Sequence, residues 1–141
     1  MNDVRAQNIE DNWRQKITDI KRTIQLWSKR DLGILGKVTI AKCFLISKIV
    51  YIMQSIGLPK TALEKINRIL YKFIWQRRYA NRKAFEKIKR TVMENDYSDG
   101  GVRMINIINM QKSFYIKWAR KIHEHNSRVS LIPFWYFSSV L

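Results

Sequence analysis

The sequence has few of the residues that stabilise small secreted proteins or hold metal ions. Its 141 residues include one cysteine and two histidines. One cysteine cannot form an internal disulfide, so the chain is typical of a reducing compartment. No apolar run follows the charged first residues, so no secretory signal is visible. We therefore expect an intracellular protein, in the nucleus or the cytoplasm, in which Cys43 is a small buried residue.

Residues that could carry catalysis are scarce as well. His123 and His125 are two positions apart, so on a helix they point about 200° from each other and cannot share a metal ion. With one thiol, a structural zinc site lacks ligands. Residues 97–100 superficially match the box of a tyrosine and paired aspartates that binds metal in polymerases, but Gly100 replaces the second carboxylate. Glycine-rich phosphate loops are also missing, so the residues favour binding over catalysis.

Acidic residues are few, and this imbalance is the strongest signal in the composition. Lys and Arg number 27 against 11 Asp and Glu, a formal net charge of +16. A field of this sign raises the local concentration of polyanions. We favour nucleic acid as the partner, because neutralising its phosphates releases condensed counterions. An anionic membrane surface and a basic surface that serves solubility alone are the competing interpretations.

The apolar residues predict a mainly α protein. They make up 46% of the chain, enough for a core in one domain. Their spacing predicts helices over residues 9–27, 38–56, 61–76 and 107–124. Residues 88–93 and 102–105 could pair as a short β-hairpin across a long loop. We expect a helical bundle with this possible hairpin as its only sheet.

The second predicted helix is apolar nearly all round, which is typical of a central buried helix. A membrane span would place Lys42 and Lys48 in the bilayer at about 2.5–3.5 kcal/mol each, so we do not expect this helix to cross a membrane. Two glycines before it, within residues 31–36, predict a turn. The first, second and fourth helices are expected to pack around seven side chains: Trp13, Ile17, Phe44, Leu45, Ile49, Ile52 and Trp118.

The third predicted helix carries two stripes. Its start reads as a capping box, with Thr61 as the N-cap and Glu64 reaching back. The buried stripe would be Leu63, Ile66, Leu70 and Phe73, and the opposite stripe is basic: Lys65, Arg68 and Lys72. Trp75 is expected to project beside the basic stripe. Burial cannot explain that stripe, so we predict that it contacts phosphates.

The basic stripe continues past the end of this helix. Between Lys72 and Arg90 there are eight basic residues and one acid, Glu86, with aromatic residues interleaved. Basic groups can contact phosphates while aromatic rings stack on bases. In the alternative interpretation, Trp75 and Phe85 belong to the core and the charges form a solvated face. The candidate binding residues of this run are Lys72, Trp75, Arg77, Arg78, Arg82, Lys83, Lys87, Lys89 and Arg90.

The order of several short motifs matches a known family. These motifs are Trp27 with Lys29-Arg30, Leu32, Leu35-Gly36-Lys37, Ser47-Lys48, Tyr51, Leu58-Pro59, residues 70–75 (Leu-Tyr-Lys-Phe-Ile-Trp), Gly100-Gly101-Val102 and residues 113–118. In this order, the chain resembles the thumb and the following helical region of LINE-type (non-long-terminal-repeat) retrotransposon reverse transcriptases. The match covers residues 9–125 and departs from the family before the paired glycines, where residues 93–99 lack a proline.

The resemblance implies a division of the chain and a role. Residues 1–80 would form a thumb-like helical region, and residues 81–141 a basic linker, the possible hairpin and a C-terminal helical segment, together one compact unit. In such enzymes the palm carries the catalytic aspartates and would hold magnesium, whereas the thumb grips the template-primer duplex. The palm would precede residue 1, so this chain would lack catalytic residues and need no cofactor of its own. Lys37, Lys42 and the basic run would bind nucleic acid.

Three functions therefore remain open. The first is a nucleic-acid-binding fragment of a reverse transcriptase, with RNA, DNA, an RNA–DNA hybrid and the rest of the enzyme as partners. The second is a non-functional retroelement remnant, or a protein-interaction module with an inherited basic surface. The third is peripheral membrane binding through the basic helices and the aromatic residues 134–137.

Overall fold

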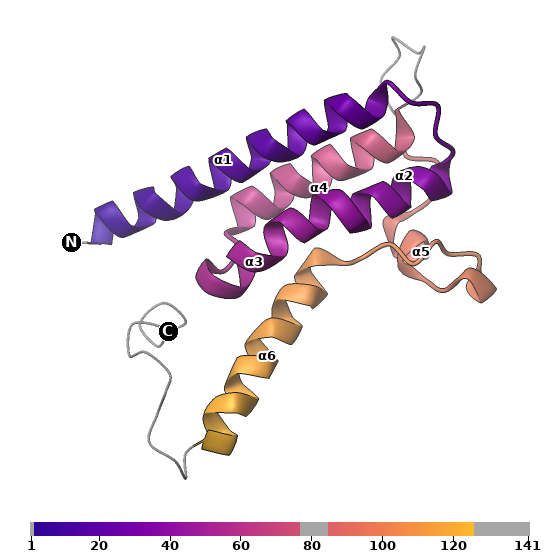
Figure 1. The fold of residues 1–141 in the computed structure, drawn as a ribbon. Helices are drawn as coiled ribbons and strands as arrows, with labels where there is room; N and C mark the ends of the chain where they lie inside the picture. Colours follow the sequence, from indigo (N-terminus) through magenta and orange to yellow (C-terminus); the bar gives the residue numbers. More distant parts are fainter. Residues whose placement is uncertain (1, 77–84, 126–141) are drawn as a thin grey trace.

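The computed structural model describes residues 2–76 and 85–125 of the chain (Figure 1). Helix α1 spans Asn2–Ser28, and α2 spans Ile34–Ile40. The π-helix η1 (Ala41–Ile46) and helix α3 (Ser47–Ile56) continue α2 without a break, and the three are called the α2–α3 rod below. Then follow α4 (Lys60–Trp75), α5 (Arg90–Glu94), the 3-10 turn η2 (Tyr97–Asp99) and α6 (Ile107–His125). The prediction of a mainly α protein is confirmed.

Helix α1, the α2–α3 rod and α4 pack side by side into one bundle (Figure 1). Each presents an apolar stripe to the other two, and the side chains at the centre are almost completely buried. They include Trp13 and Ile20 from α1, Leu45 and Ile49 from the rod, and Ile66 and Leu70 from α4. Apolar surface removed from water stabilises such a core by about 25 cal/mol per Å². The periodicity of these stripes is why the helices could be predicted.

A hydrogen bond and a glycine fix one end of the bundle. The indole Nε1 of Trp13 donates to the carbonyl oxygen of Gly57 at 3.0 Å. Gly57 has a φ of 73°, a conformation that residues with a side chain rarely adopt. A Cβ atom there would lie 2.9 Å from the hydroxyl of Tyr115. The turn between α3 and α4 therefore requires glycine at this position. Tyr115 of α6 lies against the turn.

The π-helix η1 buries some of its side chains and leaves others exposed. A π-helix has more residues per turn than an α-helix and is rare beyond a single turn. Ala41, Leu45 and Ile46 are buried within η1, whereas Phe44 is 46% exposed and Cys43 is exposed. The expectation of a buried Cys43 is therefore wrong, and Phe44 lies at the edge of the core.

Three predicted helix starts are also wrong. Helix α1 begins at Asn2, whereas the predicted start is residue 9. Helix α2 begins at Ile34, directly after Gly33, so Gly36 lies inside it and the turn is shorter than the two glycines suggested. Helix α4 begins at Lys60 after Pro59, and no side chain caps it. The rigid φ of proline already suits a position next to a helix start, so the chain enters the helix one residue before Thr61.

The predicted hairpin is a different structure. Residues 90–94 form the short helix α5, and no β-strand is present in the described residues. The amides of Val102 and Met104 both donate to the carbonyl of Met93, at 3.2 and 2.8 Å. The two segments therefore meet, but they share one acceptor instead of forming a ladder. Gly101 makes this approach possible, because a Cβ there would lie 2.1 Å from the Asn95 carbonyl oxygen.

Helix α6 contributes less to the core than expected. It contacts the rod near α3 and then extends away from the bundle (Figure 1). Ile107 is buried, Phe114 and Trp118 are half-buried, and Ile116 is 68% exposed. The main neighbour of α1 is α4, so the third predicted helix takes the place in the core that we expected for the fourth.

In the parts of the chain that the structure describes, no helix is both long enough and apolar enough to span a membrane.

Candidate nucleic-acid interface

The basic stripe of α4 is exposed along its whole length. The buried side of α4 includes Ile66 and Leu70, and the side chains of Lys65, Arg68 and Lys72 are exposed. These three cations form no ion pair with any carboxylate in the described residues. Successive members are three and four residues apart, so they share one side of the helix. Their charges are therefore available to an anion in solution.

A shallow groove between α1 and α4 extends this surface. It encloses about 340 Å³, and its walls include Arg14 and Lys21 from α1 and Lys65 from α4. Glu10 is the one acidic residue among those lining the groove. Sequence reasoning missed Arg14 and Lys21, because the α1 periodicity shows that they lie off the apolar stripe but not which helix lies beside them.

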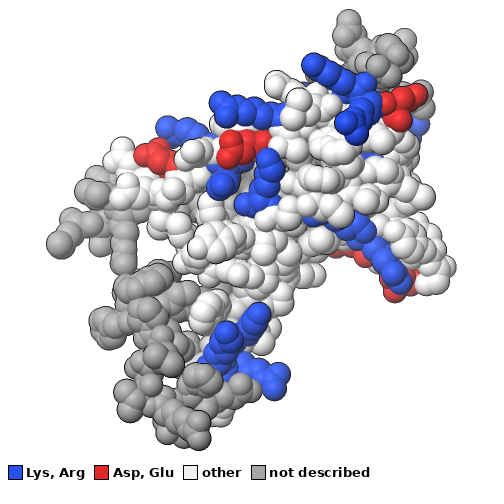
Figure 2. Space-filling model, in the orientation of Figure 1, with Lys and Arg blue, Asp and Glu red and all other residues white. Residues whose placement is uncertain are grey.

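Acidic residues neutralise part of α1. Asp11 pairs with Arg14 at 3.5 Å, and Asp19 lies 4.0 Å from Lys16 and 3.8 Å from Arg22. Exposed pairs of this kind contribute about 0–1 kcal/mol, so an incoming phosphate can compete with them. Figure 2 shows Lys and Arg side chains along α1 and at the far end of α6, with fewer acidic groups among them.

Two lysines that the resemblance assigned to binding have partners within the protein. The ammonium of Lys37 donates to the carbonyl oxygen of Gln76, at the end of α4, and lies 6.0 Å from the ring centroid of Phe73. Partial burial lowers the pKa of Lys37, and the nearby Asp31 opposes this shift. Lys42 donates to the carbonyl oxygen of Val102 at 3.4 Å. Both lysines hold backbone segments in place, and their binding role stays a prediction.

Trp75 does not project beside the basic stripe. Its side chain is only 9% exposed, and its indole Nε1 is buried without a hydrogen-bond partner. On an ideal helix Trp75 would lie next to Arg68, as predicted, but at the last position of α4 the surrounding structure covers it. A buried ring cannot stack on a base without moving, so Trp75 fits the alternative interpretation of a core residue.

The segment that begins at residue 85 lies against the end of α4. Arg90 lies over the ring of Tyr71, 4.3 Å from its centroid, and makes two hydrogen bonds to Glu86. Burial raises the pKa of Tyr71 to about 12; the nearby Glu94 and Glu86 carboxylates act in the same direction, and Arg90 opposes them. Arg90 is therefore engaged by the protein, whereas the side chains of Lys87 and Lys89 are exposed.

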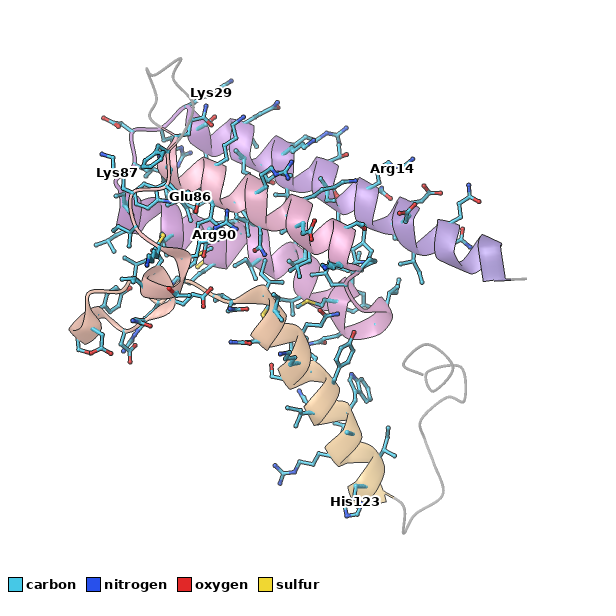
Figure 3. All side chains as sticks on the ribbon, turned by 180° about the vertical axis from the view of Figure 1, so that it is seen from behind. Arg14, Lys29, Glu86, Lys87, Arg90 and His123 are labelled. Carbon is cyan, nitrogen blue, oxygen red and sulfur yellow. The ribbon has the colours of Figure 1, made fainter. Side chains whose placement is uncertain are left out.

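The structure brings part of the predicted site together. Figure 3 shows Lys87 and Arg90 at the same end of the bundle as Lys29 from α1. Lys65, Arg68 and Lys72 share the outer side of α4, with Arg14 and Lys21 beside them. Four predicted binding residues lie outside the described residues: Arg77, Arg78, Arg82 and Lys83.

Among the described residues, no group of three or more His, Cys, Asp or Glu side chains could hold a metal ion. A scan of protein-family models and searches of curated proteins and solved structures find no match to this chain.

Proposed function

We propose that this chain binds nucleic acid through the outer side of α4 and the adjoining side of α1, as the thumb-like part of a LINE-type reverse transcriptase. The observation that carries the proposal is the stripe of Lys65, Arg68 and Lys72, exposed and without an acidic partner among the described residues. The order of motifs along the sequence supports the assignment to this enzyme class. RNA, DNA or an RNA–DNA hybrid would be the ligand, and the catalytic part of the enzyme would be a further partner.

The arrangement of the cations suits a phosphate backbone. Lys65 and Lys72 are seven residues apart on α4, about 10 Å along the helix axis. Phosphates of one strand follow each other at about 3.4 Å along a duplex, so the stripe can meet several of them. Contacts of this kind position a nucleic acid without reading its sequence. We therefore expect little sequence preference.

The test is a salt titration of binding. A labelled RNA–DNA hybrid and a DNA duplex of equal length are titrated with the full chain by fluorescence anisotropy at several salt concentrations. The logarithm of the binding constant should fall linearly with the logarithm of the salt concentration, by about 0.7–0.9 per phosphate contacted. A scrambled sequence should bind within about three-fold of the original.

Anionic vesicles are the control that distinguishes binding to nucleic acid from binding to a negatively charged membrane surface. If the chain floats with phosphatidylserine vesicles at a salt concentration at which it ignores the hybrid, peripheral membrane binding replaces the proposal. If the chain binds neither the hybrid nor the vesicles, it is a retroelement remnant or a protein-interaction module whose basic surface is merely inherited. Salt-dependent binding to nucleic acid and not to vesicles supports the proposal.

A further inference from the structure

A second surface of the bundle combines exposed aromatic rings with cations. Phe44 is 46% exposed and Tyr51 is 78% exposed, with Lys48 between them on the rod. Residues three and four apart share a side of a helix, so these three side chains form a row. We call Phe44, Lys48 and Tyr51 the aromatic row.

The aromatic row lies where the rod meets α1. The ring of Phe44 packs 5.2 Å from the ring of Trp27, and the Lys48 ammonium donates to the hydroxyl of Thr23 at 2.7 Å. Arg30 adds a second cation, 4.4 Å over the Trp27 ring. Flat rings and positive charges therefore lie close together along this edge of the bundle.

This edge is separate from the α1–α4 groove. Lys21 lines the groove, and Thr23 bonds to the aromatic row. Positions that are two residues apart on a helix, such as Lys21 and Thr23, point about 200° from each other. The two surfaces therefore lie on opposite sides of α1. A ligand on one surface leaves the other one accessible.

We propose that the aromatic row binds single-stranded nucleic acid by base stacking, with Lys48 and Arg30 near its phosphates. The inference rests on the proposed function and adds a second class of substrate to it. Single strands are held by aromatic rings that stack on bases beside cations that follow the backbone, and the row has both components. Phe44 and Tyr51 are about 10 Å apart along the helix, so different bases of one strand would meet them.

An acidic peptide fits this surface less well. Protein partners bind mainly through anchors that are enclosed in well-packed pockets and shielded from water, whereas Tyr51 projects into solvent. A second copy of the chain is opposed by the net charge of +16 on each copy. A base needs only an open ring face, and it brings the negative charge that the cations require.

The experiment compares a single-stranded oligonucleotide with an abasic oligonucleotide of the same length. Both carry the same phosphates, but the abasic strand has nothing to stack. The full chain should bind the normal strand more tightly than the abasic one, and Tyr51→Ala should weaken binding to the normal strand about five-fold or more. Because Tyr51 is 78% exposed, this variant should keep the fold, which circular dichroism checks.

Three further variants sharpen the result. Tyr51→Phe keeps the aromatic ring and should bind like the wild type, whereas Tyr51→Leu keeps apolar area without a ring and should behave like Tyr51→Ala. Tyr97→Ala is the matched control, because Tyr97 is also largely exposed, at 57%, but lies in η2. It should leave the affinity unchanged.

The outcomes separate this inference from the proposed function. Equal binding of normal and abasic strands, with the hybrid still bound, would overturn the stacking row and leave the α4 interface standing. Full retention of binding in Tyr51→Leu would also overturn it, since the contact would then be merely apolar, as with a protein or a lipid. Failure to bind the hybrid as well would overturn both proposals.

Discussion

Helices α4 and α6 are both amphipathic and both carry cations, but they are packed very differently. The apolar side of α4 is buried from Ala62 to Trp75, because α4 lies against both α1 and the α2–α3 rod. Among the described side chains of α6, Ile107 alone is buried, because α6 meets the rod near α3 and then extends away from the bundle (Figure 1). A similar sequence pattern thus gives a fixed basic surface on α4 and a projecting helix at α6.

The largest expected effect is on stability, and it differs between the two helices. Leu70 on α4 is 1% exposed, so Leu70→Ala should lower the free energy of unfolding by about 2–5 kcal/mol. Ile116 on α6 is 68% exposed, so Ile116→Ala should change it by less than about 0.5 kcal/mol. Urea denaturation followed by circular dichroism measures both. Similar losses in the two variants would mean that α6 is packed as firmly as α4.

A pH titration tests the burial of the end of α4. The pKa of Tyr71 is raised to about 12 in the folded protein, from an ordinary value of 10.0. A raised pKa means that the folded state favours the neutral phenol, so this stabilisation is complete below pH 10 and is lost as the pH rises toward 12. The free energy of unfolding of the wild type should therefore fall more steeply over this range than that of Tyr71→Phe. Parallel curves would show that the hydroxyl is solvated.

The smallest effect concerns the ion pair that covers Tyr71. Arg90 and Glu86 approach to 2.5 Å, with side chains 43% and 39% exposed. Glu86→Gln should therefore lower the stability at neutral pH by less than about 1 kcal/mol. The hydrogen bond from Arg90 lowers the pKa of Glu86 from 4.5, so the difference between wild type and variant should vanish as the pH falls below that range. A difference that persists under acidic conditions would assign the effect to packing.

The sequence allowed good prediction of the elements with a strong apolar period. The apolar stripes that contain Trp13, Leu45 and Leu70 identified the three helices of the bundle, because apolar residues recur at helical spacing where one side of a helix is buried. The spacing of the apolar residues does not indicate which helices are neighbours. It therefore placed Trp118 in the core, where the structure has the side chains of α4.

Local signals at element ends were less informative. The motif at Thr61 and Glu64 has the residues of a capping box, yet Pro59 already precedes the helix start and no side chain caps it. Residues 88–93 and 102–105 have strand-like composition, but Met93 accepts two amides from the returning segment and stays in a short helix. These outcomes depend on contacts between distant residues, which no single stretch of sequence contains.

The candidate site was predicted in part for the same reason. The exposure of Lys65, Arg68 and Lys72 follows from their position opposite a buried stripe, and it is confirmed. The partners of Lys37 and Lys42 are backbone carbonyls 39 and 60 residues away in sequence, which a local pattern cannot reveal. Arg14 and Lys21 line the same groove as Lys65, so charges on α1 cannot serve as a neutral control for the α4 stripe.

The most direct test of the account compares two triple variants from which the same amount of positive charge is removed. One replaces Lys65, Arg68 and Lys72 on α4 with glutamine, and the other replaces Lys112, Lys117 and Lys121 on α6. Binding to an RNA–DNA hybrid is measured against salt for both. The α4 variant should flatten the logarithmic salt slope by about 0.7–0.9 for each phosphate that the protein no longer neutralises, and the α6 variant should keep a slope close to that of the wild type. Equal flattening in the two variants would contradict a localised interface and leave only a diffuse positive field.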